Sequence, residues 1–466
     1  MTTSHPFRAI IVGGGPVGLM AAHTFYRAGV DFVVLERQNA LAVPEAAGAG
    51  IGVMPNTLRL LAQLGLLEAV EAIGTHMHPG TVVTNDGQPF STVDTDAWCK
   101  EFHGTGWVIV HRPELMQLLY GALPEEIRQH LFPGKEVETI ETTEEGVVVR
   151  CTDGSLERGS IVVGADGAHS KVRDCMRRIT LQESPKAAVN EEKPFVATYR
   201  CVFGHTVSPP PGISPRDEWH MHGSGISSLL LAGSEKTWFM FSQKLPKPTR
   251  ERRRYTEKDL ESFMEEVGHA HCTSTLTLND LYQTRTSCYL TDLHEGLIQH
   301  FHHDRIVLVG DAVNKQTYNT GQGWNTGVQD VVVLTNKLRA LMNNETNPGV
   351  PISKRKIEAA FGLYQKERYP VVQQAVKASM MFTRTEAWNH WYDWFADRHV
   401  LPRTGGLKLI YRAFLVPANV NAQVLDFLDE NNRPSGTIPW LHGSKGNKSE
   451  TSPGVPNISW RMALEP

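Results

Sequence analysis

Short runs of apolar residues recur along the chain. They include Arg8–Val12, Asp31–Glu36, Ile161–Gly164 and Arg305–Gly310. Runs of this kind are typical of strands buried on both faces of a parallel sheet. Between the first two runs, apolar residues recur at helical spacing and stop before Gly29, which predicts a helix. The pattern therefore predicts a βαβ unit with a right-handed crossover.

The rest of the chain changes pattern. From Lys193 to Leu245, short β-type runs predict an antiparallel sheet, and from Lys354 to Phe382 helical spacing returns. The segment from about 75 to 110 mixes Gly, Pro, Thr and aromatic residues and is expected to join the substrate side of the molecule. The predicted units are residues 1–190, the first segment of a cofactor domain; 191–290, a β-sheet substrate domain; 291–350, a return segment of the cofactor domain; and 351–466, a helical C-terminal region and tail.

Composition excludes several classes of protein. The chain has 466 residues, with 46 Lys and Arg against 50 Asp and Glu, so its net charge is −4 and no nucleic-acid partner is expected. The six cysteines form no C-x-x-C pair, which argues against a disulfide framework or a zinc site and favours a reducing compartment, the cytoplasm. No apolar run approaches ~18 residues, so no membrane-spanning helix is expected.

The turn between the first strand and the first helix is rich in glycine. Gly13, Gly15 and Gly18 form the pattern G-x-G-x-x-G, and Glu36 closes the next strand. In such a turn the first glycine permits a tight bend, the second lets the backbone approach a pyrophosphate, and the third lets helix and strand pack closely. The helix N-terminus faces the anion, and the acidic side chain can accept hydrogen bonds from an adenosine ribose. The turn therefore predicts a dinucleotide site without naming the dinucleotide.

Two further sites combine glycine with an acidic residue at the end of a predicted strand. The first contains Asp166 and Gly167, and the second contains Asp311 and leads to Gly321 and Gly323 before a helix. Either site alone is compatible with a structural turn. Three such sites in this order indicate one extended cofactor lying across the edge of the sheet.

Together the three sites resemble those of the single-component, FAD-dependent monooxygenases of the aromatic-hydroxylase type (class A). The resemblance runs from about Arg8 to Arg384 and extends to fungal secondary-metabolite monooxygenases of indole alkaloid, indole-diterpene and meroterpenoid pathways. That further resemblance is carried by Gly48–Gly52 with Pro55-Asn56, by His111–Leu115 and by Tyr199–Gly204. The family implies an α/β fold with a Rossmann-like FAD-binding domain, an antiparallel β-sheet substrate domain and a helical C-terminal part.

The resemblance also implies which residues bind FAD. Glu36 would bind the adenosine ribose, and Arg112 would lie near the ribityl or pyrophosphate group. Asp311 would bond a ribityl hydroxyl, and Asp166 would serve FAD and a transient NAD(P)H site. The helix start after Gly321 would face the pyrimidine edge of the flavin. The implied set is Gly13, Gly15, Gly18, Glu36, Gly50, Arg112, Asp166, Asp311, Gly321 and Gly323.

The family implies a reaction as well. FAD, held without a covalent link, would be reduced by NADPH or NADH and react with O₂ to a C4a-hydroperoxyflavin. One oxygen would then enter a hydrophobic natural product, such as a prenylated indole or a terpenoid, by epoxidation or hydroxylation. Two residues depart from the family pattern, because Asn314 stands where His is usual and Tyr318 where Pro is usual. Two alternatives stay open: a flavin-dependent reductase or dehydrogenase on the same scaffold, and a flavin-binding protein without turnover.

The sequence leaves the roles of three other features open, and it does not determine the oligomeric state. Arg200 lies within a predicted strand, where its charge either faces solvent or lines the substrate cleft as the candidate catalytic residue. Closely spaced histidines such as His220 and His222 lack a supporting frame of cysteines or carboxylates, so surface positions and no metal are expected. The aromatic residues from Trp388 to Phe395 favour core packing or a dimer contact over a substrate mouth or a peripheral membrane contact.

Overall fold

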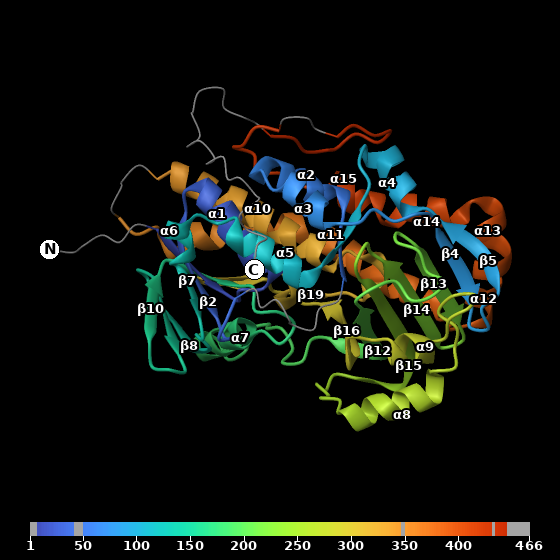
Figure 1. The fold of residues 1–466 in the computed structure, drawn as a ribbon. Helices are drawn as coiled ribbons and strands as arrows, with labels where there is room; N and C mark the ends of the chain where they lie inside the picture. The colour runs from blue at the N-terminus through green and yellow to red at the C-terminus, as the bar shows by residue number, and fades with distance from the viewer. Residues whose placement is uncertain (1–6, 42–49, 346–349, 431–433, 445–466) are drawn as a thin grey trace.

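Two β-sheets lie side by side, and long helices cover and connect them (Figure 1). The computed structural model describes residues 7–41, 50–345, 350–430 and 434–444. Gly48 and Ala49 of the second glycine-rich stretch lie outside the described residues, as does the tail from residue 445. The two sheets have different strand directions and provide different parts of the site.

The first sheet is built from the apolar runs and has six strands in the order β17-β18-β11-β1-β2-β7. Its strands run parallel except β17, which adds an antiparallel edge. All the strands predicted from apolar runs are present, and helix α1 ends at Gly29, whose φ of 71° is the left-handed conformation that favours glycine. The bounds are β1 Arg8–Val12, β2 Asp31–Glu36, β7 Leu131–Pro133, β11 Ile161–Gly164, β17 His302–His303, β18 Ile306–Leu308 and α1 Pro16–Ala28.

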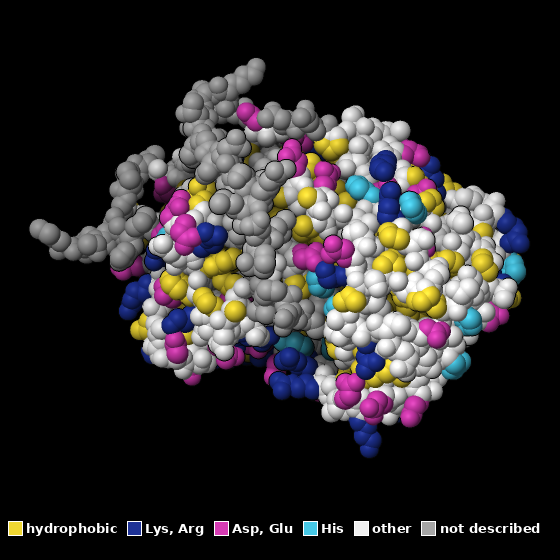
Figure 2. Space-filling view, in the orientation of Figure 1, with side chains coloured by type: hydrophobic (Ala, Val, Ile, Leu, Met, Phe, Trp, Pro, Cys, Tyr) yellow, Lys and Arg dark blue, Asp and Glu magenta, His cyan; other side chains and the backbone are white. Residues whose placement is uncertain are grey.

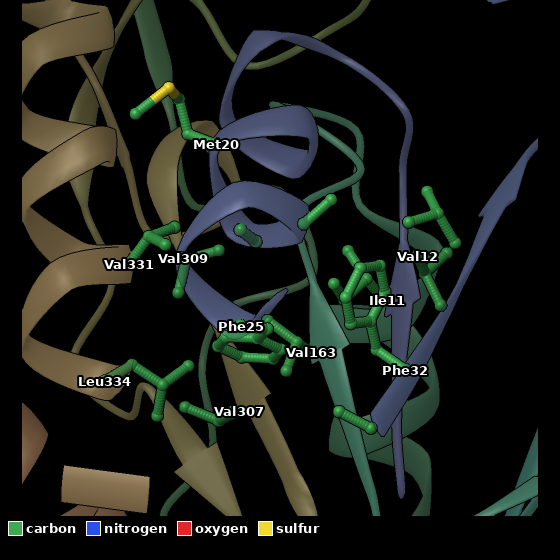
Figure 3. Packing of buried hydrophobic residues seen from close by; sticks show 14 of the residues in the cluster. Ile11, Val12, Met20, Phe25, Phe32, Val163, Val307, Val309, Val331 and Leu334 are labelled. Atoms are coloured by element: carbon green, nitrogen blue, oxygen red, sulfur yellow. The ribbon is translucent and has the colours of Figure 1, made fainter. Parts of the chain in front are cut away.

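Helices α1 and α10 (Gly323–Asn343) pack against each other and against this sheet (Figure 3). The contact is apolar, because Phe25 of α1, Val163 and Val307 of the sheet and Leu334 of α10 are fully buried. Burying a side chain of this size contributes about 1.5–3 kcal/mol. This core fixes the N-termini of both helices relative to the strand ends.

The second sheet has eight strands in the order β19-β16-β12-β15-β14-β13-β4-β5. Its pairings are antiparallel except that between β13 and β4. Side chains alternate between its faces: Val202 and Phe241 pack under helix α8 (Glu257–Val267), whereas Cys201 and Met240 belong to the opposite face. The bounds are β4 Gly80–Thr84, β5 Pro89–Val93, β12 Val196–Thr206, β13 Glu218–Gly223, β14 Ile226–Ala232, β15 Thr237–Thr249, β16 Ser287–Leu297 and β19 Asn314–Lys315.

Smaller elements connect and extend the two sheets. Strands β3 and β6 pair with each other, and β8, β9 and β10 form a three-stranded sheet. Helices α8 and α9 begin with complete capping boxes at Thr256 and Thr277. The remaining bounds are β3 Gly50–Val53, β6 Val108–His111, β8 Val137–Thr142, β9 Val147–Cys151, β10 Leu156–Gly159, α2 Pro55–Leu64, α3 Leu67–Ile73, α4 Thr95–His103, α5 Arg112–Gly121, α6 Glu125–Arg128, α7 Lys171–Glu183 and α9 Leu278–Gln283.

The C-terminal helices cover both sheets. Helix α11 (Lys354–Glu386) contacts β17 of the first sheet and β13, β14 and β16 of the second. The aromatic segment after it is not core, because Trp391, Tyr392 and Phe395 are 76%, 52% and 48% exposed, so the prediction of core packing is wrong there. Within the described ranges, no helix combines the length and apolar character needed to cross a membrane. The last elements are α12 Trp391–Phe395, a π-helical turn Ala396–Val400, α13 Leu401–Thr404, α14 Gly406–Phe414 and α15 Val416–Val420.

Candidate active site

A cavity of about 1160 Å³ lies between the two sheets. One end, which we call the glycine end, is formed by the turns that follow strands of the first sheet. The other, which we call the sheet end, is formed by the second sheet and the C-terminal helices. Gly18 is the one residue of the implied cofactor set that does not line this cavity. The residues that do line it are Gly13, Gly15, Glu36, Gly50, Arg112, Asp166, Asp311, Gly321 and Gly323.

The first glycine turn has the geometry that its spacing predicts. Gly13 has a φ of 108°, which L side chains rarely adopt. A Cβ on Gly18 would lie 1.8 Å from the carbonyl oxygen of Gly13, so only glycine permits this close packing. A Cβ on Gly15 would meet nothing within 4 Å, so the backbone there faces open space. Gly15 is also the N-cap of α1 and supplies no side-chain cap, which leaves amides of the first turn for an anion.

Glu36 ends β2 beside this turn. Its Oε2 accepts a hydrogen bond from the amide of Gly14 at 2.7 Å, and its Oε1 accepts one from the amide of Gln38 at 2.8 Å. These bonds hold the carboxylate at the cavity wall. A carboxylate has lone pairs for further donors, so Glu36 can also accept hydrogen bonds from hydroxyl groups of a ligand.

Arg173 connects the second glycine-acid site to the third. Its guanidinium donates to the carbonyl oxygens of Ala168 at 2.9 Å and Ala312 at 3.0 Å. Asp166 accepts a hydrogen bond from the hydroxyl of Ser170 at 2.6 Å, and burial raises the pKa of its carboxyl. Asp166 therefore shapes its turn and lines the cavity at the same time.

The third site leads into helix α10. Gly321 has a φ of 62°, and a Cβ there would lie 2.6 Å from the Met54 side chain. Helix α10 begins at Gly323 without a side-chain cap, so a second uncapped N-terminus lies at the glycine end. The first amides of α1 and α10 are therefore available to an anionic ligand at this end.

Arg112 and Asp311 complete the glycine end. Arg112 is the first residue of α5, and its exposed side chain lines the cavity. No hydrogen bond joins its guanidinium to any of the residues that the structure describes. Asp311 forms an ion pair with Lys315 and also lines the cavity. A free guanidinium and a carboxylate are suited to bind phosphate and hydroxyl groups respectively.

The two departures from the family pattern lie in different places. Asn314 is 2% exposed and donates to the carbonyl of Gly310 at 3.3 Å, so it supports the turn behind the cavity. Tyr318 lines the cavity where the glycine end meets the sheet end. Its ring packs edge-on against Phe203 with centroids 5.9 Å apart, and its hydroxyl accepts a hydrogen bond from Ser242 at 2.9 Å. Tyr318 therefore connects the third glycine site to the second sheet.

The sheet end combines apolar walls with a polar cluster on β13 and with Asp292 and His294 of β16. Strand β13 places Glu218, His220 and His222 on the cavity face, because residues two apart on a strand share a face. Glu386 at the end of α11 and Asp397 of the π-helical turn line the same end. The apolar lining residues include Trp98, Trp107, Phe203, Leu229, Leu231, Met240 and Tyr411.

The prediction that these histidines lie at the surface is wrong for this pair. His222 is 6% exposed, and its Nδ1 is hydrogen-bonded to Oδ2 of Asp397 at 2.7 Å. The Nε2 of His220 is hydrogen-bonded to Oε1 of Glu218 at 2.7 Å. The alternation Glu218-x-His220-x-His222 was the available signal, since it places one carboxylate on the same strand face as both rings.

Arg200 does not line the cavity. It lies on the opposite face of β12, where its guanidinium donates to Gln243 at 2.7 Å and pairs with Glu266 of α8 at 2.7 Å. The guanidinium also lies over the ring of Phe263, 4.9 Å from its centroid. The residue of β12 that lines the cavity is Phe203. Successive residues of a strand point to opposite faces, and Arg200 lies an odd number of residues from Phe203. The hypothesis that Arg200 projects toward the flavin is therefore wrong.

Comparison with known proteins identifies the family. Residues 7–379 match the family described as FAD binding domain. The chain is 33% identical over 448 residues to FAD-dependent monooxygenase srdH of Neurospora crassa, covering 93% of this chain and 98% of that protein. It is 32% identical to FAD-dependent monooxygenase olcE of Penicillium canescens, covering 91% of this chain and 90% of that protein. The chain therefore belongs to the class A FAD-dependent monooxygenases, and it is an oxidoreductase of secondary metabolism.

Solved structures show the same fold. HpxO of Klebsiella pneumoniae, complexed with FAD and uric acid, superposes with a TM-score of 0.69 at 20% identity, covering 91% of this chain and 99% of that chain. The 2,6-dihydroxypyridine-3-hydroxylase from Arthrobacter nicotinovorans gives a TM-score of 0.62 at 17% identity, covering 83% and 95%. The cofactor is FAD, as predicted. The glycine end fits it, because Gly15 leaves open space beside two uncapped helix N-termini.

Proposed function

We propose that this protein uses NADPH or NADH and O₂ to insert one oxygen atom into a hydrophobic small molecule, such as a prenylated indole or a terpenoid, by epoxidation or hydroxylation. The observation that carries the proposal is the single cavity, whose glycine end suits FAD and whose sheet end has aromatic and aliphatic walls. The fungal relatives named FAD-dependent monooxygenase support oxygen insertion over reduction.

We assign the residues of the glycine end to parts of FAD. Glu36 binds the adenosine ribose, and Arg112 with the N-terminus of α1 binds the pyrophosphate or ribityl group. Asp311 bonds a ribityl hydroxyl, and Asp166 serves FAD and the passing NAD(P)H. The amides that begin α10 at Gly323 face the pyrimidine edge. The support is that all these groups line one continuous wall of the cavity.

FAD held at the glycine end would supply the hydride-accepting and oxygen-transfer chemistry. The residues of this chain hold the reactants and exclude water. The uncapped N-terminus of α10 stabilises negative charge next to it. The rings of Tyr318 and Phe203 line the junction between the two ends, and Trp107 and Met240 supply apolar contacts for the substrate.

The purified protein tests this proposal. We expect a yellow protein with one non-covalent FAD per chain, and NADPH oxidation that rises when a prenylated indole or a terpenoid is added. A colourless chain that takes up no FAD would contradict the assignment of the glycine end. NADPH oxidation that no hydrophobic compound stimulates would contradict the substrate class.

An exposed patch beside the sheet end favours contact with a membrane surface. We call it the aromatic patch, and its residues are Trp391, Tyr392, Trp394, Phe395 and Leu409. Arg403 of α13 and Arg412 of α14 are exposed, and Leu401 of α13 and Ile410 of α14 line the cavity. Figure 2 shows basic and hydrophobic side chains at the end of the molecule that α12–α14 occupy in Figure 1. Aromatic and basic residues together suit an anionic lipid surface.

We therefore propose that the aromatic patch touches membranes peripherally and receives hydrophobic substrates there. We also propose a cytoplasmic location. All six cysteines are free, which fits a reducing compartment. Sedimentation with vesicles containing anionic lipid tests the contact, and binding no stronger than to neutral vesicles would contradict it.

A further inference from the structure

The sheet end carries more negative charge than an apolar substrate requires. Glu218, Glu386 and Asp397 line it together with the imidazoles of His220 and His222. With its three carboxylates ionised, this cluster is negative even when both imidazoles are protonated. Among the described lining residues, no Lys or Arg pairs with the cluster: Lys315 of β19 pairs with Asp311, and the others belong to the glycine end, namely Arg37, Arg112, Lys135 and Lys171.

Glu386 is the carboxylate of this cluster that forms no ion pair with any residue the structure describes. It is 9% exposed, and its Oε2 accepts a hydrogen bond from the side-chain amide of Asn319. Burial raises the pKa of its carboxyl, an effect that the nearby His222 and His220 oppose. No Lys or Arg of the described ranges forms an ion pair with it. A buried carboxylate in this position is costly unless a ligand supplies the opposite charge.

The imidazole of His222 is positioned by a hydrogen bond with Asp397. The Oδ2 of Asp397 is hydrogen-bonded to Nδ1 of His222 at 2.7 Å and accepts the indole N–H of Trp388 at 2.8 Å. Trp388 has a φ of 39°, a left-handed conformation that strains a residue other than glycine. The fold therefore tolerates backbone strain at a residue that positions Asp397 and, through it, His222.

The cluster can hold a small hydrogen-bonding group. One ring nitrogen of His220, one of His222 and a carboxylate oxygen of Glu386 lie within 4.8 Å of one another. A group centred among these atoms lies no more than about 2.8 Å from each, which is a hydrogen-bond length. The same three atoms are potential metal ligands, so the test of the site includes a metal ion.

We propose that the substrate carries a protonated amine nitrogen, which binds between Glu386, His220 and His222. This inference rests on the proposed function of the sheet end as the substrate site. The ammonium group donates to the Glu386 carboxylate and to an unprotonated ring nitrogen, and it supplies the missing positive charge. Anchored there, the apolar part of the substrate lies along Met240 and Phe203 toward the glycine end.

Titration calorimetry on the FAD-loaded protein tests the proposal with three indoles that differ in charge: tryptamine is cationic, 3-ethylindole is neutral and indole-3-acetate is anionic. We expect tryptamine to bind at least about tenfold more tightly than 3-ethylindole, and indole-3-acetate to bind most weakly. Glu386→Gln should remove this preference and leave the affinity for 3-ethylindole unchanged. The matched control is Glu266→Gln, which changes a carboxylate on the opposite side of the second sheet and should leave all three affinities unchanged.

Equal affinity of the wild-type protein for the three indoles would overturn the proposal without any variant. A preference that survives in Glu386→Gln would also overturn it. Titration with Zn²⁺ is the third arm, and stoichiometric binding that Glu386→Gln abolishes would show a metal site instead. FAD content is measured on every sample. An FAD-loaded protein without amine preference refutes only this inference, whereas a chain that takes up no FAD refutes the proposed function.

Discussion

The two ends of the cavity are built from different parts of the polypeptide. The glycine end is mostly backbone: turns after β1, β11 and β18 and the uncapped starts of α1 and α10. The sheet end is mostly side chains, which come from β4, β5 and β12–β16 and from helices near the C-terminus. Backbone amides suit a cofactor shared by a whole family, whereas side chains can change with the substrate. Under the proposed function, cofactor binding therefore depends on local turns, and substrate choice depends on side chains that tertiary packing brings together.

The largest effect is expected from Gly15→Val, which blocks the glycine end without unfolding it. A Cβ at Gly15 meets nothing within 4 Å, so the new side chain occupies the space meant for the cofactor. FAD affinity should fall more than about 100-fold, or ~3 kcal/mol. The checks are FAD content after gel filtration and thermal unfolding of the apoprotein. Gly362→Val, on α11 and also without neighbours within 4 Å, is the control. A yellow Gly15→Val protein would contradict the assignment.

Glu36→Ala should weaken FAD binding by about 1–3 kcal/mol, or roughly 5- to 150-fold. The variant removes the acceptor of the Gly14 and Gln38 amides together with the acceptor for the ribose. Glu36→Asp should lose less, because it keeps the charge. Fluorescence titration of the apoprotein with FAD measures both variants. Unchanged affinity in Glu36→Ala would show that this carboxylate does not reach the ribose.

Strand β12 allows the two faces of the second sheet to be compared directly. Phe203→Ala opens the cavity wall beside Tyr318, so oxygenated product per NADPH should fall about tenfold and hydrogen peroxide should rise. Arg200→Ala removes a partly exposed ion pair under α8 and should leave product yield unchanged, with a stability loss below about 1 kcal/mol. Measuring product, NADPH and peroxide on both variants checks this. Loss of product with release of hydrogen peroxide in Arg200→Ala but not in Phe203→Ala would contradict the assignment of the two faces.

The smallest effect on chemistry is expected from the aromatic patch. The double variant Trp391→Ser and Phe395→Ser should weaken binding to anionic vesicles about 3- to 10-fold and leave turnover of a dissolved substrate unchanged. Leu156→Ser, at an exposed apolar residue of β10 outside the patch, is the control. Vesicle binding that is equal in the double variant and the wild type would remove the proposed membrane contact.

The glycine end could be predicted from sequence because its parts are local. Gly13, Gly15 and Gly18 act through their own backbone, and Glu36 ends the next strand of the same βαβ unit. Their spacing alone determines how turn, helix and carboxylate lie. The family and its cofactor follow from three such sites occurring in order.

The sheet end could not be predicted in the same way. His222 meets Asp397, and Asn319 meets Glu386, only because α11 and the π-helical turn pack on β13. Arg200 shows a second limit of sequence analysis. Alternation along β12 was visible, but which set of residues faces inward depends on which face α8 covers.

Oxygen labelling tests the central claim most directly. The FAD-loaded protein is incubated with NADPH, ¹⁸O₂ and hydrophobic amines such as prenylated tryptamines, and the product masses are measured. Our account predicts one ¹⁸O atom in each product molecule, one NADPH consumed per product, and no product from Gly15→Val. A product that has gained or lost hydrogen without acquiring ¹⁸O would identify a reductase or dehydrogenase and would contradict the account.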